Sequence, residues 1–542
     1  MGHRLPFKDA LMLGDRAVQE PLFIPGSLRE LIPDDHILKQ VAAVLDLRWV
    51  RDAVKDCYAL NNGRPSVPPE CAVRLMLAGF LLGIVHDRKL MREAQVNLAI
   101  RWFAGYALDQ SLPEHSSLTR IRQRWGAARF RQIFLRTVRQ CVEAGLVCGE
   151  TVHVDATLMR ADVSWESLAL QHAEQTLTEN TLTDDPPPAQ PPPGRGRPAG
   201  PKAKRRSATD PQATLATSCR QHHLEPTYKQ HAVVDDRAGV ILDVALSTGE
   251  TSEGTQLPDQ LDRVTATLGQ APATVTSDAG YAHSANYAAC EARGIDPVIP
   301  PQRTRRRKYE RIPARRFRYD ARHQRIRCPA GKALLPAGRT AQGQVFRARA
   351  ADCRACPLRA RCFAPSGHAR LVIIPAGYEA LLRARRRRAR GWDEATRTAY
   401  RRHRWRVEGV HGEAKTQHGL RRAVRRGLAN VAIQVYLTAA VMNLKRLARQ
   451  RAVIHVAITR FGRVIARLWA SLGRRFQEMA RRGGNETTLL PQAAWIERGE
   501  TGRGLFNSPS VPLFPQPYRV ATARLVGPRE GKDNFALVHC DV

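Results

Sequence analysis

Three acidic residues stand in sequence contexts that suit metal-dependent chemistry. Asp155 lies in Thr-Val-His-Val-Asp-Ala-Thr, Asp278 in Thr-Val-Thr-Ser-Asp-Ala-Gly-Tyr, and Glu408 in Arg-Trp-Arg-Val-Glu-Gly-Val-His. Mg²⁺ prefers hard oxygen ligands such as carboxylates, and two such ions can promote in-line attack on a phosphodiester. The pattern therefore predicts a site for two Mg²⁺ or Mn²⁺ ions. Asp155 would bridge both ions, and Asp278 and Glu408 would each complete one coordination shell.

The residues around Glu408 add a second argument. Four side chains recur every three or four residues and so share one face of a helix: Arg404, Glu408, His411 and Lys415. A carboxylate flanked by cations suits a phosphate held over a metal ion. Glu413 is the main rival to Glu408, but five residues correspond to about 140° around a helix. Glu413 would therefore not share this face, and Glu408 is the predicted ligand.

The elements that must position these acids follow from the hydrophobic pattern between residues 146 and 300. Val152, Val154 and Ala156 alternate with polar residues, which predicts a strand with Asp155 on the face opposite the valines. A hairpin, a helix, a short strand ending at Asp278, a helix and another strand are expected to follow. This order is found in ribonuclease H-like nucleotidyl transferases. The predicted fold class is therefore α/β, with a mixed sheet flanked by helices.

The rest of the chain divides into regions of different character. Residues 1–145 predict a helical N-terminal domain for DNA end binding or oligomerisation, with a purely structural role as an equal alternative. The core region 146–300 contains a Pro-rich, basic loop at 184–208, which is expected to be disordered. Residues 391–482 complete the core, and 483–542 predict a poorly ordered tail. After residue 429 an apolar helix is expected to pack against the sheet through Leu437, Val441, Leu444 and Ala448.

An insertion is predicted at residues 301–390. Its segment 303–327 holds twelve Lys and Arg against two acids, with interleaved aromatic residues at Tyr309, Phe317 and Tyr319. Phosphate contact with some stacking is one interpretation, and an exposed basic hairpin is the other. Four cysteines in a Cys-x24-Cys-x2-Cys-x5-Cys pattern predict a structural Zn²⁺ site or ordinary reduced thiols: Cys328, Cys353, Cys356 and Cys362.

Charge is the unusual feature of the composition. The 542 residues include 86 Lys+Arg against 50 Asp+Glu, which gives a net charge of +36 and a pI near 10.8. A polyanion is the natural partner of such a chain. The longest apolar run, 75–85, is too short to span a bilayer, and the N-terminus lacks an apolar signal region. Eleven scattered cysteines do not suit a secreted disulfide framework. A cytoplasmic protein without membrane contact is therefore expected.

The segment around Glu408 resembles the Tyr-Arg-Glu-Lys signature of DDE transposases from bacterial insertion sequences. Arg404, Glu408 and Lys415 match its last three members in spacing. Tyr400 lies four residues before Arg404, whereas the signature places its tyrosine three residues before. The turn from Asp278 to Tyr281 and the later Arg-Arg-Gly stretch are also similar to this group. The resemblance covers roughly residues 20–450, and residues 483–542 have no counterpart in it.

This resemblance implies a DNA transposase that cleaves and joins strands with two divalent metal ions at Asp155, Asp278 and Glu408. It implies binding to double-stranded DNA, both terminal inverted repeats and target, through residues of the signature helix: Tyr400, Arg404, His411 and Lys415. It further implies a homo-oligomer in a synaptic complex and a bacterial, nucleoid-associated location. Two alternatives stay open from the residues alone. One is a nuclease of the same fold, and the other is a non-catalytic repressor derived from a transposase.

Overall fold

The computed structural model describes most of the chain between residues 27 and 482. The described ranges are 27–58, 66–163, 168–170, 205–217, 224–302, 312, 316–362 and 367–482. Most of the predicted loop 184–208 lies outside these ranges, as do the basic run 303–311 with Tyr309 and the predicted tail 483–542. None of the helices in the described ranges is both long and apolar enough to cross a membrane.

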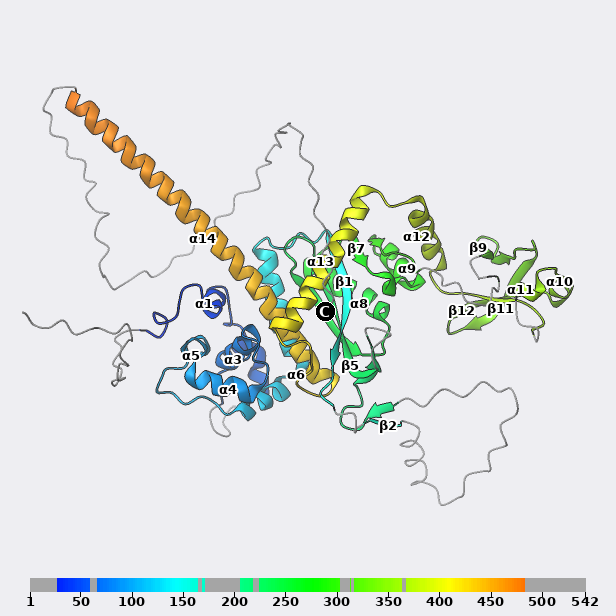
Figure 1. The fold of residues 1–542 in the computed structure, drawn as a ribbon, viewed down its shortest axis with the longest axis horizontal. Coiled ribbons are helices and arrows are strands. Elements are labelled where there is room, and N and C mark those ends of the chain that lie inside the picture. Colours follow the sequence, from blue (N-terminus) through cyan, green and yellow to red (C-terminus); the bar gives the residue numbers. More distant parts are fainter. Residues whose placement is uncertain are drawn as a thin grey trace, which may run out of the picture. The chain divides into compact units, whose positions relative to one another are not determined.

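A mixed sheet of six strands (Figure 1) contains Asp155, and one of its strands ends just before Asp278. Its strands are β1 (Thr151–Arg160), β4 (Thr214–Ala216), β5 (Glu225–Asp235), β6 (Ile241–Thr248), β7 (Thr274–Ser277) and β8 (Asp296–Val298). The order is β4-β5-β1-β7-β8, and β6 also pairs with β5. β5 runs antiparallel to β1, β4 and β6, whereas β7 is parallel to both β1 and β8. The hairpin and the later strands agree with the sequence-based expectation.

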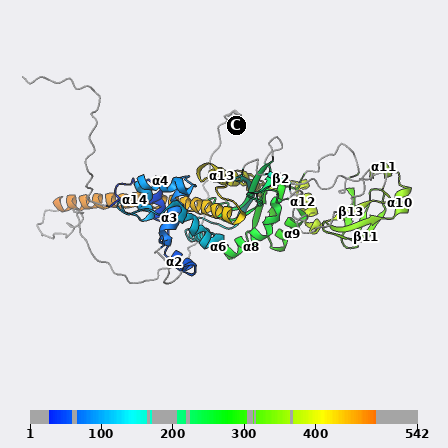
Figure 2. The ribbon, with the colours of Figure 1, turned by 90° about the horizontal axis from the view of Figure 1, so that it is seen from below.

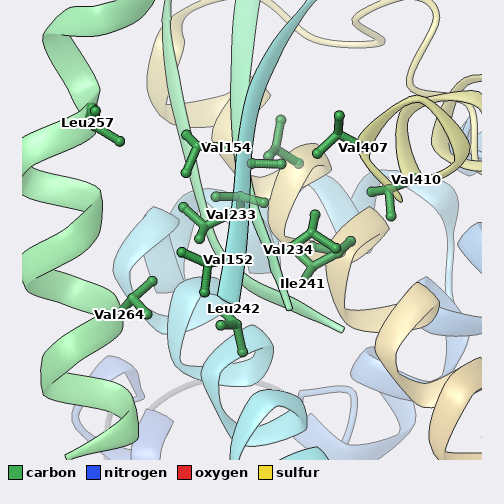
Figure 3. Packing of buried hydrophobic residues seen from close by; sticks show 14 of the residues in the cluster. Val152, Val154, Val233, Val234, Ile241, Leu242, Leu257, Val264, Val407 and Val410 are labelled. Atoms are coloured by element: carbon green, nitrogen blue, oxygen red, sulfur yellow. The ribbon is translucent and has the colours of Figure 1, made fainter. Parts of the chain in front are cut away.

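Helices cover both faces of this sheet. Leu257 and Val264 of α8 (Leu257–Leu268) lie on one side of the strands, and Val407 and Val410 of α13 (Glu394–Gln417) lie on the other (Figure 3). The expected alternation in β1 is only partly observed. His153 is as fully buried as the valines beside it, because α13 covers the face on which an alternating strand would meet water.

The N-terminal region is helical, as predicted, and has a hydrophobic core of its own. Its helices are α1 (Ile37–Ala42), α2 (Val50–Val54), α3 (Pro69–Leu81), α4 (Asp87–Val96), α5 (Leu98–Ala104) and α6 (His115–Glu143), with a short 3-10 turn at Lys55–Cys57. A buried ion pair crosses this core, where the Arg122 guanidinium binds the Asp87 carboxylate through two bonds of 2.6 and 2.8 Å. Arg425 from the C-terminal half also pairs with Asp87.

The long helix α14 (Leu428–Arg482) corrects one prediction. Its expected apolar stripe does not pack against the sheet. These four residues belong to the N-terminal helical core: Leu437, Val441, Leu444 and Ala448. A different stripe of the same helix, including Val431, Val435 and Ala439, belongs to the core of the sheet. The first part of α14 is therefore apolar on two faces, and each face completes a different core.

The insertion forms a second, five-stranded antiparallel sheet (Figure 2). Its strands are β9 (Arg318–Asp320), β10 (Arg325–Arg327), β11 (Ala333–Thr340), β12 (Gly343–Ala348) and β13 (Leu371–Ile374), joined by α10 (Ala350–Arg354) and α11 (Arg359–Cys362). Phe317, Leu334 and Phe346 lie in its small core. The chain then returns through α12 (Tyr378–Arg390), which packs against α9 (Ser284–Ala292). A two-stranded ribbon pairs β2 (Leu168–Leu170) with β3 (Arg205–Ser207).

Contacts divide the chain into two units, residues 1–463 and residues 464–542. The three predicted acids, the four cysteines and the helices α1 to α6 all belong to the first unit.

Candidate active site

Asp155 and Asp278 lie next to each other on neighbouring parallel strands. Val154 in β1 is paired with Ser277 in β7, so the following residue of each strand is an aspartate. Asp155 continues along β1, whereas Asp278 follows the last residue of β7. There it caps the short 3-10 turn Ala279–Tyr281 by accepting a 2.8 Å hydrogen bond from the backbone N–H of Gly280. The sheet register thus brings together two of the three predicted ligands.

Helix α13 brings the third acid to the same sheet. The helix contacts β1 and β7, and it begins after Asp393, whose side chain accepts a hydrogen bond from the N–H of Thr396 at 2.7 Å. A row of buried polar side chains connects the helix to the strands. The Thr276 hydroxyl lies 3.0 Å from His403 Nδ1 of the helix and 2.6 Å from His153 Nδ1 of β1. These contacts set the position of α13 over the two aspartates.

Glu408 and Glu413 occupy different environments on this helix. The Glu408 side chain is 61% exposed and accepts a 3.0 Å bond from Arg404, itself 82% exposed. Glu413 is only 20% exposed and pairs with Lys445 at 2.6 Å and with His418 at 3.5 Å. Burial alone would raise its pKa, but His418, Arg446 and Lys445 lower the pKa of Glu413 to about 2. Glu413 is therefore held in an internal ion-pair network, which leaves Glu408 as the accessible acid.

The predicted DNA-contacting residues of α13 differ in their surroundings. His411 is 7% exposed, and its Nε2 lies 3.7 Å from an Asp155 oxygen. Burial, followed by the charge of Lys415, lowers the pKa of His411 to about 3, so the ring is neutral. Lys415 is half-buried, and its own pKa is lowered by burial. Tyr400 packs against the rings of Trp392 and His403. His411 therefore lies inside the site beside Asp155, while Arg404 faces solvent.

The pKa of Asp155 reflects its burial and the acids near it. Burial raises the pKa of Asp155 to about 7, and a hydrogen bond at Ala156 partly opposes this rise. The carboxylates of Asp278, Glu253 and Glu408 are smaller contributions to the same raised pKa. Within the described residues, no Lys or Arg forms an ion pair with Asp155 or Asp278. The site therefore carries excess negative charge that a cation would relieve.

Glu253 is an acid that the sequence did not single out. It begins the 3-10 turn Glu253–Gln256, between β6 and α8, and its carboxylate lies 3.5 Å from the Lys229 ammonium. A Cβ atom added to Gly280 would meet a Glu253 oxygen at 2.7 Å and an Asp278 oxygen at 2.9 Å. The two carboxylates thus approach the same point. Only the location of Glu253 between a strand and a helix could have indicated it in the sequence.

These residues fit a divalent metal by their chemistry. Asp155 and Asp278 follow paired residues of neighbouring strands and have no Lys or Arg partner among the described residues, and the buried Tyr281 hydroxyl has no hydrogen-bond partner. In the conformation described, however, no three His, Cys, Asp or Glu side chains of the described ranges stand in an arrangement that could hold a metal ion. Metal binding by all three predicted acids would therefore require Glu408 to leave Arg404.

The four cysteines of the insertion gather around one small cavity of about 30 Å³. They are reduced, and they come from the end of β10, from α10 and the turn after it, and from α11: Cys328, Cys353, Cys356 and Cys362. Burial raises the pKa of Cys362, and the other three thiols contribute to the rise. The fold therefore brings together residues that are up to 34 positions apart in sequence.

Two segments of the chain match known protein families. A family model described as a transposase domain (DUF772) matches residues 26–124, and one described as a transposase DDE domain matches residues 327–448. The second segment includes Glu408, Lys415 and the four cysteines. A search of curated proteins finds no match.

Two solved structures show weak similarity. The Mos1 transposase, in a paired-end complex with the left transposon end, is 12% identical with a TM-score of 0.14, over 46% of this chain and 65% of that chain. The piggyBac transposase, in a synaptic complex with hairpin DNA, is 10% identical with a TM-score of 0.24, over 78% of this chain and 81% of that chain. The chain thus spans just under two thirds of the Mos1 protein. Both TM-scores are too low for either structure to define its fold.

Proposed function

We propose that this chain, a DDE-type transposase of an insertion sequence by its two family matches, cleaves DNA strands at the ends of its element and joins them to a target. One observation carries the proposal. Asp155 and Asp278 are adjacent on parallel strands, and the helix bearing Glu408 packs against both of those strands. This arrangement suits phosphodiester chemistry that depends on divalent metal ions.

We further propose that the catalytic core is ribonuclease H-like. The strand order β6-β5-β1-β7-β8 supports this, because the first three strands are antiparallel neighbours and the last two run parallel to β1. The first acid lies within β1, the second follows β7, and the third lies on the late helix α13. These three positions support the proposal.

Each residue of the site has a proposed role. Asp155, Asp278 and Glu408 would hold two Mg²⁺ or Mn²⁺ ions, which when bound would activate the attacking oxygen and stabilise the leaving oxygen. Water is the first nucleophile, and a freed 3′-hydroxyl is the second. Arg404 and Lys415 would bind the phosphate once Glu408 turns toward Asp155, because Arg404 then loses its only close carboxylate within the described residues.

The DNA partner is proposed from charge. The net charge of +36 favours binding to a polyanion, and several of the positively charged residues lie on α12. A cavity of about 320 Å³ on this helix is lined by arginines and one glycine: Arg383, Arg386, Arg387, Arg390 and Gly391. Arg383 and Arg387 pair with Glu291 and Asp296, whereas Arg386 and Arg390 have no ion-pair partner within the described residues. The proposal also includes a homo-oligomer of this chain that binds the terminal inverted repeats.

A structural Zn²⁺ ion in the insertion is proposed on separate grounds. Four reduced thiols line one cavity, and four thiolates are the ligand types of a structural zinc site. Zinc binding would require the thiols to move closer together than they stand in the conformation described. Bound Zn²⁺ would stabilise the small five-stranded sheet, whose hydrophobic core has few buried residues.

The test is cleavage of labelled DNA that carries the element's ends in Mg²⁺. Asp155→Asn, Asp278→Asn and Glu408→Gln are each expected to abolish cleavage while leaving DNA binding within about twofold, because the carboxylates contribute charge to the metals and not to the DNA. Asp259→Asn, which removes an exposed acid in α8, is the matched control and should cleave normally. Full cleavage by the Asp155 variant would refute the proposal. Pre-cut ends then separate a transposase from a nuclease, because only a transposase joins them to target DNA.

A further inference from the structure

We propose that an arginine-lined cavity between the N-terminal helices and the start of α14 binds a backbone phosphate of the element's end DNA. This inference rests on the proposed function, because it names a further place where the same DNA contacts the chain. The cavity is separate from the three predicted acids, from α13 and from the arginines of α12.

The cavity has a volume of about 320 Å³ and lies where segments distant in sequence meet. Arg122 and Gln123 come from the first half of α6, and Arg425 and Arg426 come from the segment just before α14. Asp162, which follows β1, also lines it. Three of these five side chains are arginines, so the balance of charge decides what the cavity can bind.

Two of the arginines share a single carboxylate. The Arg122 guanidinium binds the Asp87 carboxylate through hydrogen bonds of 2.6 and 2.8 Å, and Arg425 pairs with the same carboxylate. The side chains of Arg122 and Asp87 are 5% and 7% exposed, so salt and water screen these charges poorly. The three groups together leave one positive charge, and Arg425 is the member of the group that reaches solvent.

The third arginine, Arg426, has no carboxylate partner within the described residues. Asp162 is the nearest candidate, but its carboxylate pairs with Arg422 at 3.1 Å. Arg426 instead donates a 3.0 Å hydrogen bond from its Nε to the backbone carbonyl of Asp162. This bond fixes the guanidinium without neutralising it. The cavity wall therefore carries two positive charges that no acid of the described ranges balances.

A phosphate group suits this wall. Guanidinium groups present planar N–H donors that match phosphate oxygens, and the exposed amide of Gln123 adds an uncharged donor. The positive end of the α14 dipole adds to the field, because the helix begins at Leu428 and its third residue, Asn430, also lines the cavity.

Exposed cations near the cavity favour a polyanion over a single free anion. Arg88 and Lys89 directly follow Asp87, and Arg120 and Arg124 lie two residues to either side of Arg122. All four are exposed, and none has an ion-pair partner in the part of the chain that the structure describes. A single bound anion would leave these charges unused, whereas a DNA backbone offers a phosphate to each.

The end of β1 connects this cavity to the proposed active site. Asp155 lies within β1, and Asp162 follows the strand by two residues. Backbone hydrogen bonds of 3.2 and 2.7 Å join Arg160 at the end of β1 to Arg421 and Ala423. The seven residues from Asp155 to Asp162 span at most about 25 Å, which corresponds to about seven base pairs of duplex. The contact is therefore expected within one turn of duplex from the cleaved bond.

The first experiment measures the affinity of the full chain for a labelled duplex that carries one end of the element, at several salt concentrations. Arg426→Gln should lower the slope of log affinity against log salt concentration by about one, because one phosphate contact is lost. Its affinity at 0.1 M salt should fall about eightfold. Arg139→Gln removes the same charge from an exposed position of α6 beyond the kink at Gly126, and it should leave the slope unchanged.

A second variant tests the opposite wall without removing an arginine. Gln123→Glu adds a carboxylate that would pair with the unbalanced arginines and repel a phosphate, so its affinity should fall about as far as that of Arg426→Gln. Gln132→Glu adds the same charge to an exposed position of α6 beyond the kink and should bind DNA like the wild type. Both changed glutamines are exposed, so circular-dichroism melting curves should be unchanged.

Ethylation interference on the same duplex locates the contact, because ethylation removes the charge of one phosphate at a time. In the wild type, binding should be weakened by ethylation of a phosphate within about ten base pairs of the cleaved bond, which is one turn of duplex. Arg426→Gln should lose the interference at that phosphate and keep it elsewhere.

The outcomes separate this inference from the proposed function. A wild type that neither binds the duplex nor cleaves it refutes the proposed function. If the wild type does both, and Arg426→Gln and Gln123→Glu bind as it does, only the cavity contact is refuted. An interference pattern that is the same in Arg426→Gln and wild type also refutes the contact, even if free inorganic phosphate binds the cavity. Loss of affinity in both variants, with one phosphate missing from the pattern, supports the inference.

Discussion

Replacing Glu413 by glutamine should destabilise the core without touching the chemistry. Glu413 is 20% exposed and pairs with Lys445, Arg446 and His418, which lower its pKa from 4.5 to about 2 against the effect of burial. A shift of this size corresponds to roughly 3 kcal/mol of stability at neutral pH. Removing one partner of a buried pair typically costs a similar 3–5 kcal/mol. Glu408→Gln breaks only an exposed pair and should cost no more than about 0.5 kcal/mol.

Urea unfolding followed by circular dichroism measures the free energy of unfolding of each variant. DNA cleavage, assayed at a temperature where both variants are folded, measures their activity. Glu413→Gln should be unstable but active, and Glu408→Gln stable but inactive. The folded pKa of Glu413 lies below its unfolded value, so its stabilisation is complete well above pH 4.5 and is lost as the pH falls toward 2. The stability difference between wild type and Glu413→Gln should shrink accordingly. A stable Glu413→Gln protein that cannot cleave would refute the assignment of the two glutamates.

Three further changes probe other parts of the molecule. Asp87→Asn leaves Arg122 and Arg425 without their buried carboxylate and should destabilise the protein by roughly 3–5 kcal/mol in thermal unfolding, whereas Asp52→Asn at an exposed position should be neutral. The double variant Arg386→Gln/Arg390→Gln should reduce by about two the slope of log affinity for DNA against log salt concentration, and an unchanged slope would exclude α12 from the interface. Cys353→Ser should remove the zinc that elemental analysis is expected to find in the wild type at about one ion per chain, and a wild type free of zinc would contradict the cysteine site.

The hydrophobic periodicity of the sequence predicted much of the site, because the site residues lie on or next to regular strands and a helix. Hydrophobic alternation predicted the strand β1 with Asp155, and a short apolar run before Asp278 predicted the strand β7. In the structure these two strands are parallel neighbours. Helical phase alone separated Glu408 from Glu413, and the structure places these acids in different surroundings.

Features that depend on tertiary packing could not be predicted from the sequence. Glu253 reaches Asp278 only because the chain turns back after β6 and brings its turn beside the end of β7. His411 shares a helical face with Arg404, yet one end of that face is buried against the sheet and the other is exposed. Periodicity likewise showed one apolar stripe on α14, and it could not show which core that stripe completes.

The position of α14 in both hydrophobic cores has a consequence for synthesis on the ribosome. The helix begins at residue 428, so the N-terminal helices and the strands of the sheet emerge long before the segment that both cores require. A chain that stops before this segment leaves both cores open, with apolar surface available to proteases and to aggregation. Abortive translation products should therefore be degraded rather than persist as fragments that carry Asp155 and Asp278. The fold thus makes the first part of α14, residues 428–448, a condition for assembling the proposed site.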